Sequence, residues 1–153
     1  MQATMSDLAS AKQTFLTDLA DVTSPKVQAL IEAMFLAATA DGEFAPEESL
    51  QFSATIEALT DKKFDGASIQ KRVEQLSLLL KKEGRPARLS EVAKRLPLAG
   101  RETALILAAA ITASDGKIED RENELLADLA EALEVPQTRA IELITKVHRS
   151  ARV

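Results

Sequence analysis

The chain has 153 residues and a formal net charge of −5, with no Cys, Trp or Tyr and a single His. The missing cysteines exclude a disulfide framework, a thiolate zinc site and a cysteine nucleophile, and one histidine excludes a multi-histidine metal site. The acidic balance gives no overall attraction to nucleic acid or to an anionic membrane.

The length and composition predict one all-α domain. A chain of this size fits a single compact core, so we expect residues 1–153 to form one domain. The hydrophobic fraction is 46%, supplied largely by Ala and Leu, and only five residues are Phe. Ala and Leu favour helices, whereas strands favour β-branched and aromatic residues.

The N-terminal third predicts two helices. Charged residues interrupt the apolar ones within 1–20, which argues against a signal peptide and predicts an N-terminal helix capped by Ser6. A clearer helix begins at Ser24-Pro25, with apolar residues at helical spacing. It is expected to stop at Asp41-Gly42, since Gly adopts the left-handed conformation that ends many helices.

A third helix is predicted from Pro46 to about Leu59, with acidic residues near its positive N-terminal end. Residues 60–97 predict a helical connector with one helix over about 67–82. Gly84-Arg85-Pro86 is expected to break that helix, and Ser90 to cap or begin a short one that Pro97 ends.

The remaining sequence predicts three helices. From about Leu98 the chain is nearly all apolar as far as Asp115-Gly116, which is typical of a central helix. An acidic-starting helix follows at about residue 119, and a final helix covers about 136–150. The expected fold is a compact bundle of about seven to eight helices. The longest apolar run, 104–111, falls short of the ~20 residues that a membrane span needs, so we expect a cytoplasmic protein without membrane insertion.

The two Asp-Gly turns belong to an internal two-fold repeat. Shifting the chain by 74 residues, from 41 to 115, aligns about 25–59 with about 98–133. Identical pairs then include Asp41 with Asp115 and Glu48 with Glu122, and Phe44 aligns with Ile118. Both copies therefore read Asp-Gly-x-(Phe/Ile)-x-x-x-Glu between an alanine-rich helix and a leucine-bearing one.

Two interpretations of these turns are open. The Asp side chains can accept hydrogen bonds from loop amides while the Glu side chains complete capping boxes, with no ligand involved. Alternatively, the carboxylates can share a cation, because Asp-Gly, an aliphatic residue and Glu match the second half of an EF-hand loop. The first half is missing: its ligand positions fall on Ala37 and Thr39, and on Ile111 and Ala113.

The segments 29–48 and 108–122, which hold ALIEAMFLAATADGEFAPEE and AAAITASDGKIEDRE, resemble the TerB family, the tellurite-resistance TerB-like domain. The resemblance covers about residues 26–150, with both acidic turns in order. It implies an all-helical cytoplasmic domain, a link to tellurite and other chemical stress, and a metal-binding role for the acidic turns. No catalytic activity comes with it.

Carried over by position, the candidate metal ligands are Asp41, Glu48, Asp115 and Glu122, with Glu47 and Asp120 as weaker neighbours. Oxygen ligands suit calcium, magnesium or manganese, whereas zinc and copper usually recruit His or Cys. We expect a non-enzymatic domain that binds such a divalent cation, needs no organic cofactor and engages protein partners. The alternative is a protein-interaction module whose acidic turns are only structural caps.

Other chemistry-bearing residues are assigned structural roles. His148 is expected in the last turn of the final helix, where positive charge suits the helix dipole. A local basic patch is formed by Lys62-Lys63 and by Lys81-Lys82 through Arg85 and Arg88. It has no aromatic residue nearby to stack on bases, so we expect a solvated face rather than a nucleic-acid site. Neither a Gly-x-Ser-x-Gly elbow nor a phosphate-binding loop is present.

Overall fold

The computed structural model describes residues 13, 25–39, 46–59, 66–113 and 120–151. These residues contain seven helices and no strand, which confirms the all-α expectation. The helices are α2 (Pro25–Ala38), α3 (Pro46–Leu59), α4 (Gly66–Glu83), α5 (Arg85–Arg95), α6 (Leu98–Ala113), α7 (Asp120–Ala132) and α8 (Gln137–Ala151). The helix expected within 1–20 lies outside the described residues, Gln13 excepted.

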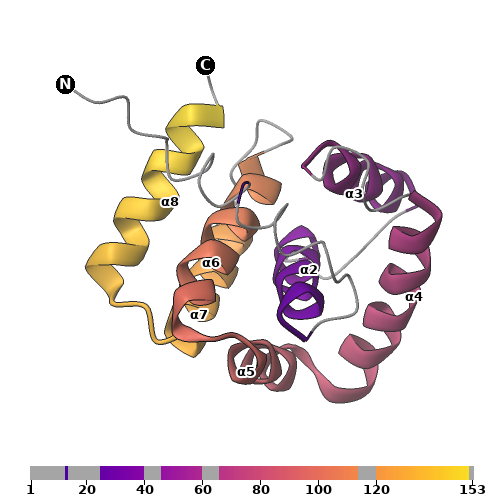
Figure 1. The fold of residues 1–153 in the computed structure, drawn as a ribbon, viewed down its shortest axis with the longest axis horizontal. Coiled ribbons are helices and arrows are strands. Elements are labelled where there is room, and N and C mark those ends of the chain that lie inside the picture. The colour runs from indigo at the N-terminus through magenta and orange to yellow at the C-terminus, as the bar shows by residue number, and fades with distance from the viewer. Residues whose placement is uncertain (1–12, 14–24, 40–45, 60–65, 114–119, 152–153) are drawn as a thin grey trace.

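Helix α2 occupies the centre of the bundle. Figure 1 shows it between α6, α7 and α8 on one side and α3 and α4 on the other, with α5 below. Its residues are buried on every side from Ala29 to Ala37, including Glu32. A helix that is apolar all round has to be enclosed by neighbours, and α2 meets that requirement by packing most extensively on α6.

Helix α6 is the second central element, as its apolar sequence predicts. Every residue from Thr103 to Ala109 is buried. Small side chains let it approach α2 closely: at Gly100, a Cβ would stand 3.2 Å from Cε of Lys26 and 3.5 Å from Cδ2 of Leu96. Buried apolar residues from all seven described helices join one core cluster, so α4 and α5, which lie in the predicted connector, contribute to the core.

Helix α5 differs from the sequence expectation. It begins at Arg85, so Arg85 and Pro86 lie in its first turn and Ser90 lies in its interior rather than at its start. The reason is Gly84, whose φ of 88° is accessible to glycine and lets α4 and α5 meet across one residue. Pro86 does not break the helix, since a first-turn residue needs no backbone N–H bond. Pro97 follows the helix end, as expected.

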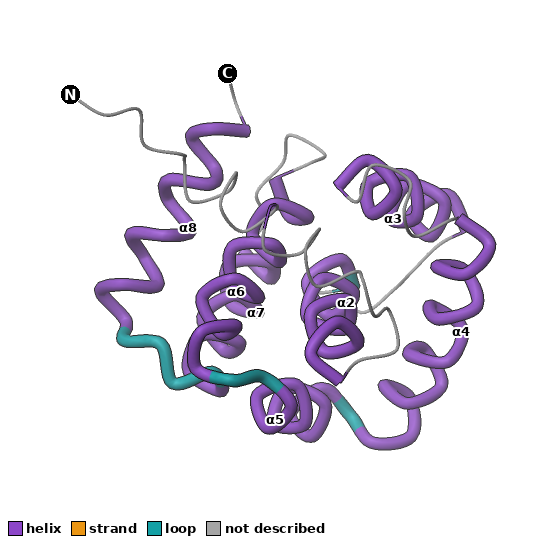
Figure 2. Tube along the Cα trace, viewed as in Figure 1, coloured by secondary structure: helices purple, strands orange, loops and turns teal. Residues whose placement is uncertain are grey.

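Figure 2 shows short loops between α5 and α6 and between α7 and α8, and backbone hydrogen bonds close both links. The α7–α8 link is closed by the Val135 N–H, which donates to the Ala130 carbonyl at 2.9 Å, with Glu134 at a φ of 59°. This is the bonding of a Schellman motif, here with Glu in the left-handed position where Gly is usual. Arg101 adds a tie from α6 by donating to the Leu133 carbonyl at 3.2 Å.

One buried ion pair fastens α5 to α2. Glu32 is 1% exposed and Arg88 is 3% exposed. Nε of Arg88 donates to Oε2 of Glu32 at 2.6 Å, and Nη2 donates to Oε1 at 2.7 Å. Hydrogen bonding to Glu32 raises the pKa of Arg88 above its ordinary value, against the opposing effect of burial. Arg88 therefore keeps its positive charge inside the core.

Among the described helices, none combines the length and the apolar character that crossing a bilayer requires.

Replacing Glu32 alone tests the ion pair. We expect Glu32→Met to lower the free energy of unfolding by about 3–5 kcal/mol, because Arg88 stays buried without its main partner. The double change Glu32→Met with Arg88→Met should recover most of that loss, since it leaves no buried charge. Urea unfolding followed by circular dichroism gives both values. A single variant within about 1 kcal/mol of the parent would contradict the structural role assigned to the pair.

Candidate functional site

The candidate metal ligands are only partly within the described structure. Asp41 and Asp115 lie outside the described residues. Glu47 and Glu48 are the second and third residues of α3, while Asp120 and Glu122 are the first and third residues of α7. Only the backbone of these four is described, and it places each in the first turn of its helix, as predicted. A carboxylate there faces free backbone N–H groups and the positive end of the helix dipole.

The helices that precede the turns confirm that the ligands of the first half of an EF-hand loop are missing. Ala37 lies in α2, and Ile111 and Ala113 lie in α6, so these positions carry no side-chain oxygen and are held in helix. Thr39 directly follows α2, and its hydroxyl donates to the Phe35 carbonyl at 3.0 Å. That hydroxyl is committed to the end of its own helix. Neither turn has the full ligand set of an EF-hand loop.

Arg85 binds the C-terminal end of α2, directly before the first turn. Its Nη2 donates to the Thr39 carbonyl at 2.7 Å, and its Nη1 donates to the Leu36 carbonyl at 3.0 Å. The Leu36 carbonyl also accepts from the Thr39 hydroxyl at 3.3 Å. Carbonyls in the last turn of a helix lack intrahelical backbone donors, and a guanidinium satisfies their hydrogen bonding and suits the negative end of the dipole. The chain therefore places a permanent positive charge at the helix end that leads to Asp41.

The expectation of a solvated basic patch is wrong for two of its members. Arg88 is buried against Glu32, and Arg85 is half-buried at the end of α2. Lys81 and Lys82 are exposed, as expected, and Lys62 and Lys63 lie outside the described residues. The error arose because the acceptors lie on α2, some 50 residues earlier, and a local charge run does not reveal distant partners.

His148 lies in the last turn of α8, as predicted, and is also buried. Its Nε2 is 3.1 Å from Oγ1 of Thr112, whose hydroxyl also lies 2.8 Å from the Ala109 carbonyl. Thr112 is next to the last residue of α6, three positions before Asp115. The polar contact thus joins the C-terminal ends of α6 and α8.

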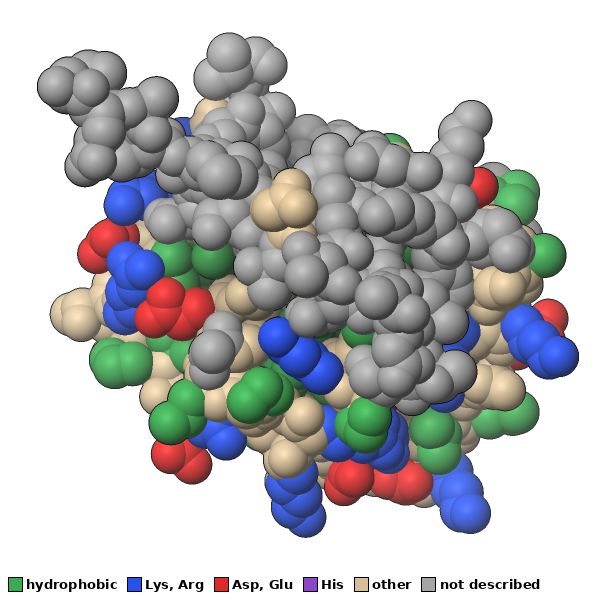
Figure 3. All heavy atoms as spheres, in the orientation of Figure 1, with side chains coloured by type: hydrophobic (Ala, Val, Ile, Leu, Met, Phe, Trp, Pro, Cys, Tyr) green, Lys and Arg blue, Asp and Glu red, His purple; other side chains and the backbone are tan. Residues whose placement is uncertain are grey.

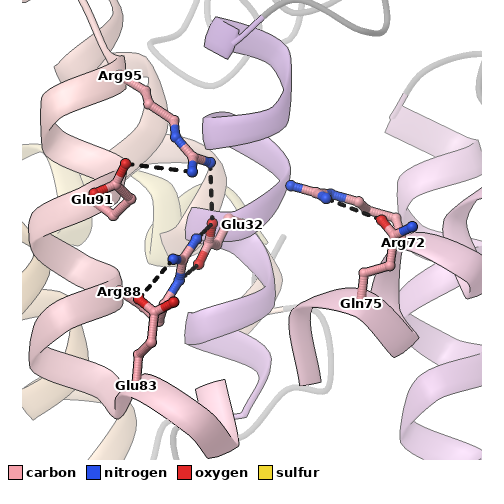
Figure 4. A network of polar contacts seen from close by, with 7 residues as sticks. All are labelled: Glu32, Arg72, Gln75, Glu83, Arg88, Glu91 and Arg95. Atoms are coloured by element: carbon pink, nitrogen blue, oxygen red, sulfur yellow. Dashed lines mark hydrogen bonds and ion pairs between the residues drawn. The ribbon is translucent and has the colours of Figure 1, made fainter. Parts of the chain in front are cut away.

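A group of charged side chains surrounds Glu32 where α2, α4 and α5 meet. Figure 4 shows Arg88 and Arg95 reaching Glu32 from α5 and Arg72 extending toward it from α4. Nη1 of Arg95 is 3.7 Å from Oε1 of Glu32, and Nη2 of Arg95 is 3.5 Å from Oε1 of Glu91. Burial lowers the pKa of Arg72 from its usual value, Glu32 opposes that change, and Arg95 and Arg88 add to it. Sequence analysis did not identify this group; a charged residue inside the apolar run of α2 was its only signal.

An apolar groove of about 630 Å³ separates α7 from α8. Ala127, Ala130 and Ile144 contribute to its lining, Ile141 is 57% exposed beside them, and Glu131 is its one charged lining residue among those described. A space of this size is within the range of ligand and peptide pockets. Within the described residues, no group of three or more His, Asp or Glu side chains is placed to hold a metal ion.

The cap formed by Arg85 can be tested by substitution. We expect Arg85→Gln to lower the free energy of unfolding by about 1–3 kcal/mol, because buried helix-end carbonyls lose charge-assisted partners. Lys81→Gln removes an equal charge from an exposed site near the end of α4 and should change stability by less than about 0.5 kcal/mol. Urea unfolding of both variants makes the comparison. Equal losses in the two variants would contradict the cap.

The comparisons with known proteins add no family assignment. A scan against protein-family models finds no match, and searches of curated proteins and of solved structures find no significant similarity.

Proposed function

We propose that this chain is a non-enzymatic, TerB-like helical domain that binds a divalent cation through Asp41, Glu48, Asp115 and Glu122. The tellurite and chemical-stress role is proposed from the resemblance of the two motif segments alone. In this proposal the metal-loaded turns, or the surface around them, engage a protein partner.

The observation that carries the proposal is the pairing of α2 with α6. Lys26, near the start of α2, lies against Gly100, near the start of α6, and the two helices pack together. When two helices begin side by side and stay packed along their length, their last residues also lie in the same part of the bundle. Because each one leads to an Asp-Gly turn, we expect the two turns to lie at one end of the bundle.

The helix bounds support the proposed two-fold repeat. Helix α3 begins at Pro46 and α7 at Asp120, an offset of 74 residues, which equals the offset between Asp41 and Asp115. The preceding helices, α2 and α6, start 73 residues apart and end 75 apart. Each turn is thus held between corresponding helices, and Glu48 and Glu122 have the same position in the first turn that follows.

The donor set suits a hard cation. The four carboxylates supply only oxygen, and calcium requires roughly six to eight oxygen ligands, so backbone carbonyls and water would complete the coordination. Magnesium, which keeps several of its waters, fits a smaller set of carboxylates. The proposal therefore covers calcium, magnesium and manganese and predicts modest affinity.

Calorimetric titration of chelator-stripped protein with each of these ions tests the proposal. With a dissociation constant of about 1 mM, 10 mM metal should stabilise the fold by about 1.4 kcal/mol. That gain corresponds to a rise in melting temperature of roughly 3–6 °C. The rise and the binding heat should disappear in Asp41→Asn with Asp115→Asn.

A charge-matched control separates ligation from general charge effects. Glu74→Gln with Asp128→Asn also removes two negative charges, from exposed positions of α4 and α7, and should keep the metal response. Absence of binding heat and of any melting shift in the parent chain would rule out the cation site. A response that persists in Asp41→Asn with Asp115→Asn would place the ligands elsewhere.

The second candidate function is a protein-interaction module whose acidic turns are structural caps. The groove between α7 and α8 favours it, because an apolar lining with an exposed Ile141 can accept an apolar side chain of a partner. A stable fold with no metal response would leave this candidate as the better account.

A further inference from the structure

A row of exposed side chains runs along the α8 side of the groove between α7 and α8. Gln137, Ile141 and Thr145 line the groove and follow one another at intervals of four residues, so they lie on one face of the helix. Arg149 continues this row near the end of α8. Ile141 is 57% exposed, and burying an apolar side chain of this size is favourable. The row is thus apolar in its middle, basic at its end and open to another molecule.

The two ends of the groove differ in charge. Glu131 lines the end where α7 leads into α8, and Glu134 is exposed in the link that follows. Arg149 is exposed near the opposite end, about 18 Å from the start of α8 at Gln137. One end of this face is therefore acidic and the other is basic.

The charges at these two ends are not used within the described chain. Arg139 pairs with Glu142 at 2.8 Å, and Lys146 pairs with the same carboxylate at 3.2 Å, so the charges in the middle of α8 are matched. Glu131 and Arg149 have no ion-pair partner among the described residues. Unmatched opposite charges at the two ends of one apolar row favour a partner whose charges run in the reverse order.

A second copy of this chain, related by a two-fold axis, presents that reverse order. In an antiparallel pair of α8 helices centred on Ile141, residues before it on one helix face residues after it on the other. Arg149 of one copy then lies opposite Leu133 of the other, and Leu133 is close to Glu131 in the chain. The arrangement occurs twice, because an isologous contact uses the same surface of both copies. Both unmatched charges of both chains thereby gain partners.

We propose that the groove between α7 and α8 is a self-association surface, on which two copies of this chain pack α8 against α8 in antiparallel orientation. Each Ile141 enters the groove of the other copy, against Ala127 and Ala130. Each Arg149 pairs with Glu131 of the other copy. The contact is independent of the proposed cation site, since none of its residues belongs to either acidic turn.

Shape and charge are consistent with a weak, reversible dimer. Figure 1 shows α8 at the outer edge of the described bundle, where a second chain can reach it. Figure 3, in the same orientation, shows acidic and basic side chains interspersed over the described part of this face, and the net charge of −5 repels like chains at long range. Attraction therefore has to come from the local row. One helix pair buries about 1,000 Å² in total, at the low end of specific interfaces, so we expect a dissociation constant of about 10–100 μM.

Sedimentation equilibrium of the full chain measures this association directly. The buffer contains a chelator, so that the result does not depend on metal binding and a failure of the cation site leaves it unchanged. We expect mainly monomer at about 5 μM and mainly dimer at about 500 μM. A chain that stays monomeric at the higher concentration would overturn the proposal and leave the groove to a different protein.

Reversing one charge at a time distinguishes this interface from any other. Glu131→Arg places two like-charged pairs in the dimer, and so does Arg149→Glu, so each variant by itself should weaken association by about 10- to 100-fold. An equimolar mixture of the two variants should associate as the parent does, because both cross-pairs are then of opposite charge. The same reversals at exposed positions of α4, Glu74→Arg and Lys71→Glu, should leave association unchanged. Dimerisation that persists in either Glu131→Arg or Arg149→Glu, or a mixture of these two that stays monomeric, would overturn the proposal.

Ile141→Ala tests the apolar part of the row. It should weaken association by about 10- to 100-fold, since two isoleucines leave the interface of each dimer. Leu78→Ala is the matched control, because Leu78 is 70% exposed on α4 and its loss should keep the parent's affinity. All substituted positions are exposed, so circular dichroism should show the helix content of the parent. Equal affinity of Ile141→Ala and the parent would also overturn the proposal.

Discussion

A carboxylate at the centre of an apolar helix constrains the packing of this bundle. Glu32 lies in α2 among Ala29, Leu30, Ile31 and Ala33, all of which are buried. An isolated charge in such a place is very unfavourable, so a cation has to be brought to it. Arg88 does so from α5 and fixes both the position of α5 and its rotation about its own axis. Arg85, one turn earlier on α5, then reaches the carbonyls at the end of α2.

Other arginine side chains also connect helices at their ends. Arg101 reaches the Leu133 carbonyl beyond α7, and Arg139 at the start of α8 pairs with Glu102 at the start of α6. The core itself is built largely from Ala, Leu and Ile, which pack well but distinguish poorly between alternative helix registers. The hydrogen bonds and ion pairs at the helix ends depend on direction and so supply that distinction. In a chain without cysteine, they connect helices that are distant in sequence.

Sequence patterns predicted the parts of the fold that depend on local chemistry. Pro25 and Pro46 begin α2 and α3, and the apolar run after Leu98 forms the buried helix α6, because helix starts and periodicity are encoded within a few residues. Local patterns placed the end of α4 correctly before Gly84, but they put the start of the next helix at Ser90, whereas α5 begins at Arg85. Leu50 of α3 and Ile141 of α8 are exposed although both are large and apolar.

The candidate site was less predictable, because its partners are far apart in the chain. Glu32 and Arg88 are 56 residues apart, and Thr112 and His148 are 36 apart. Such pairs become visible only when the helices are packed. The carboxylates at 48 and 122 could be placed in the first turns of their helices, since capping is local. Whether they share a cation depends on the long-range geometry of the two turns, which no local pattern encodes.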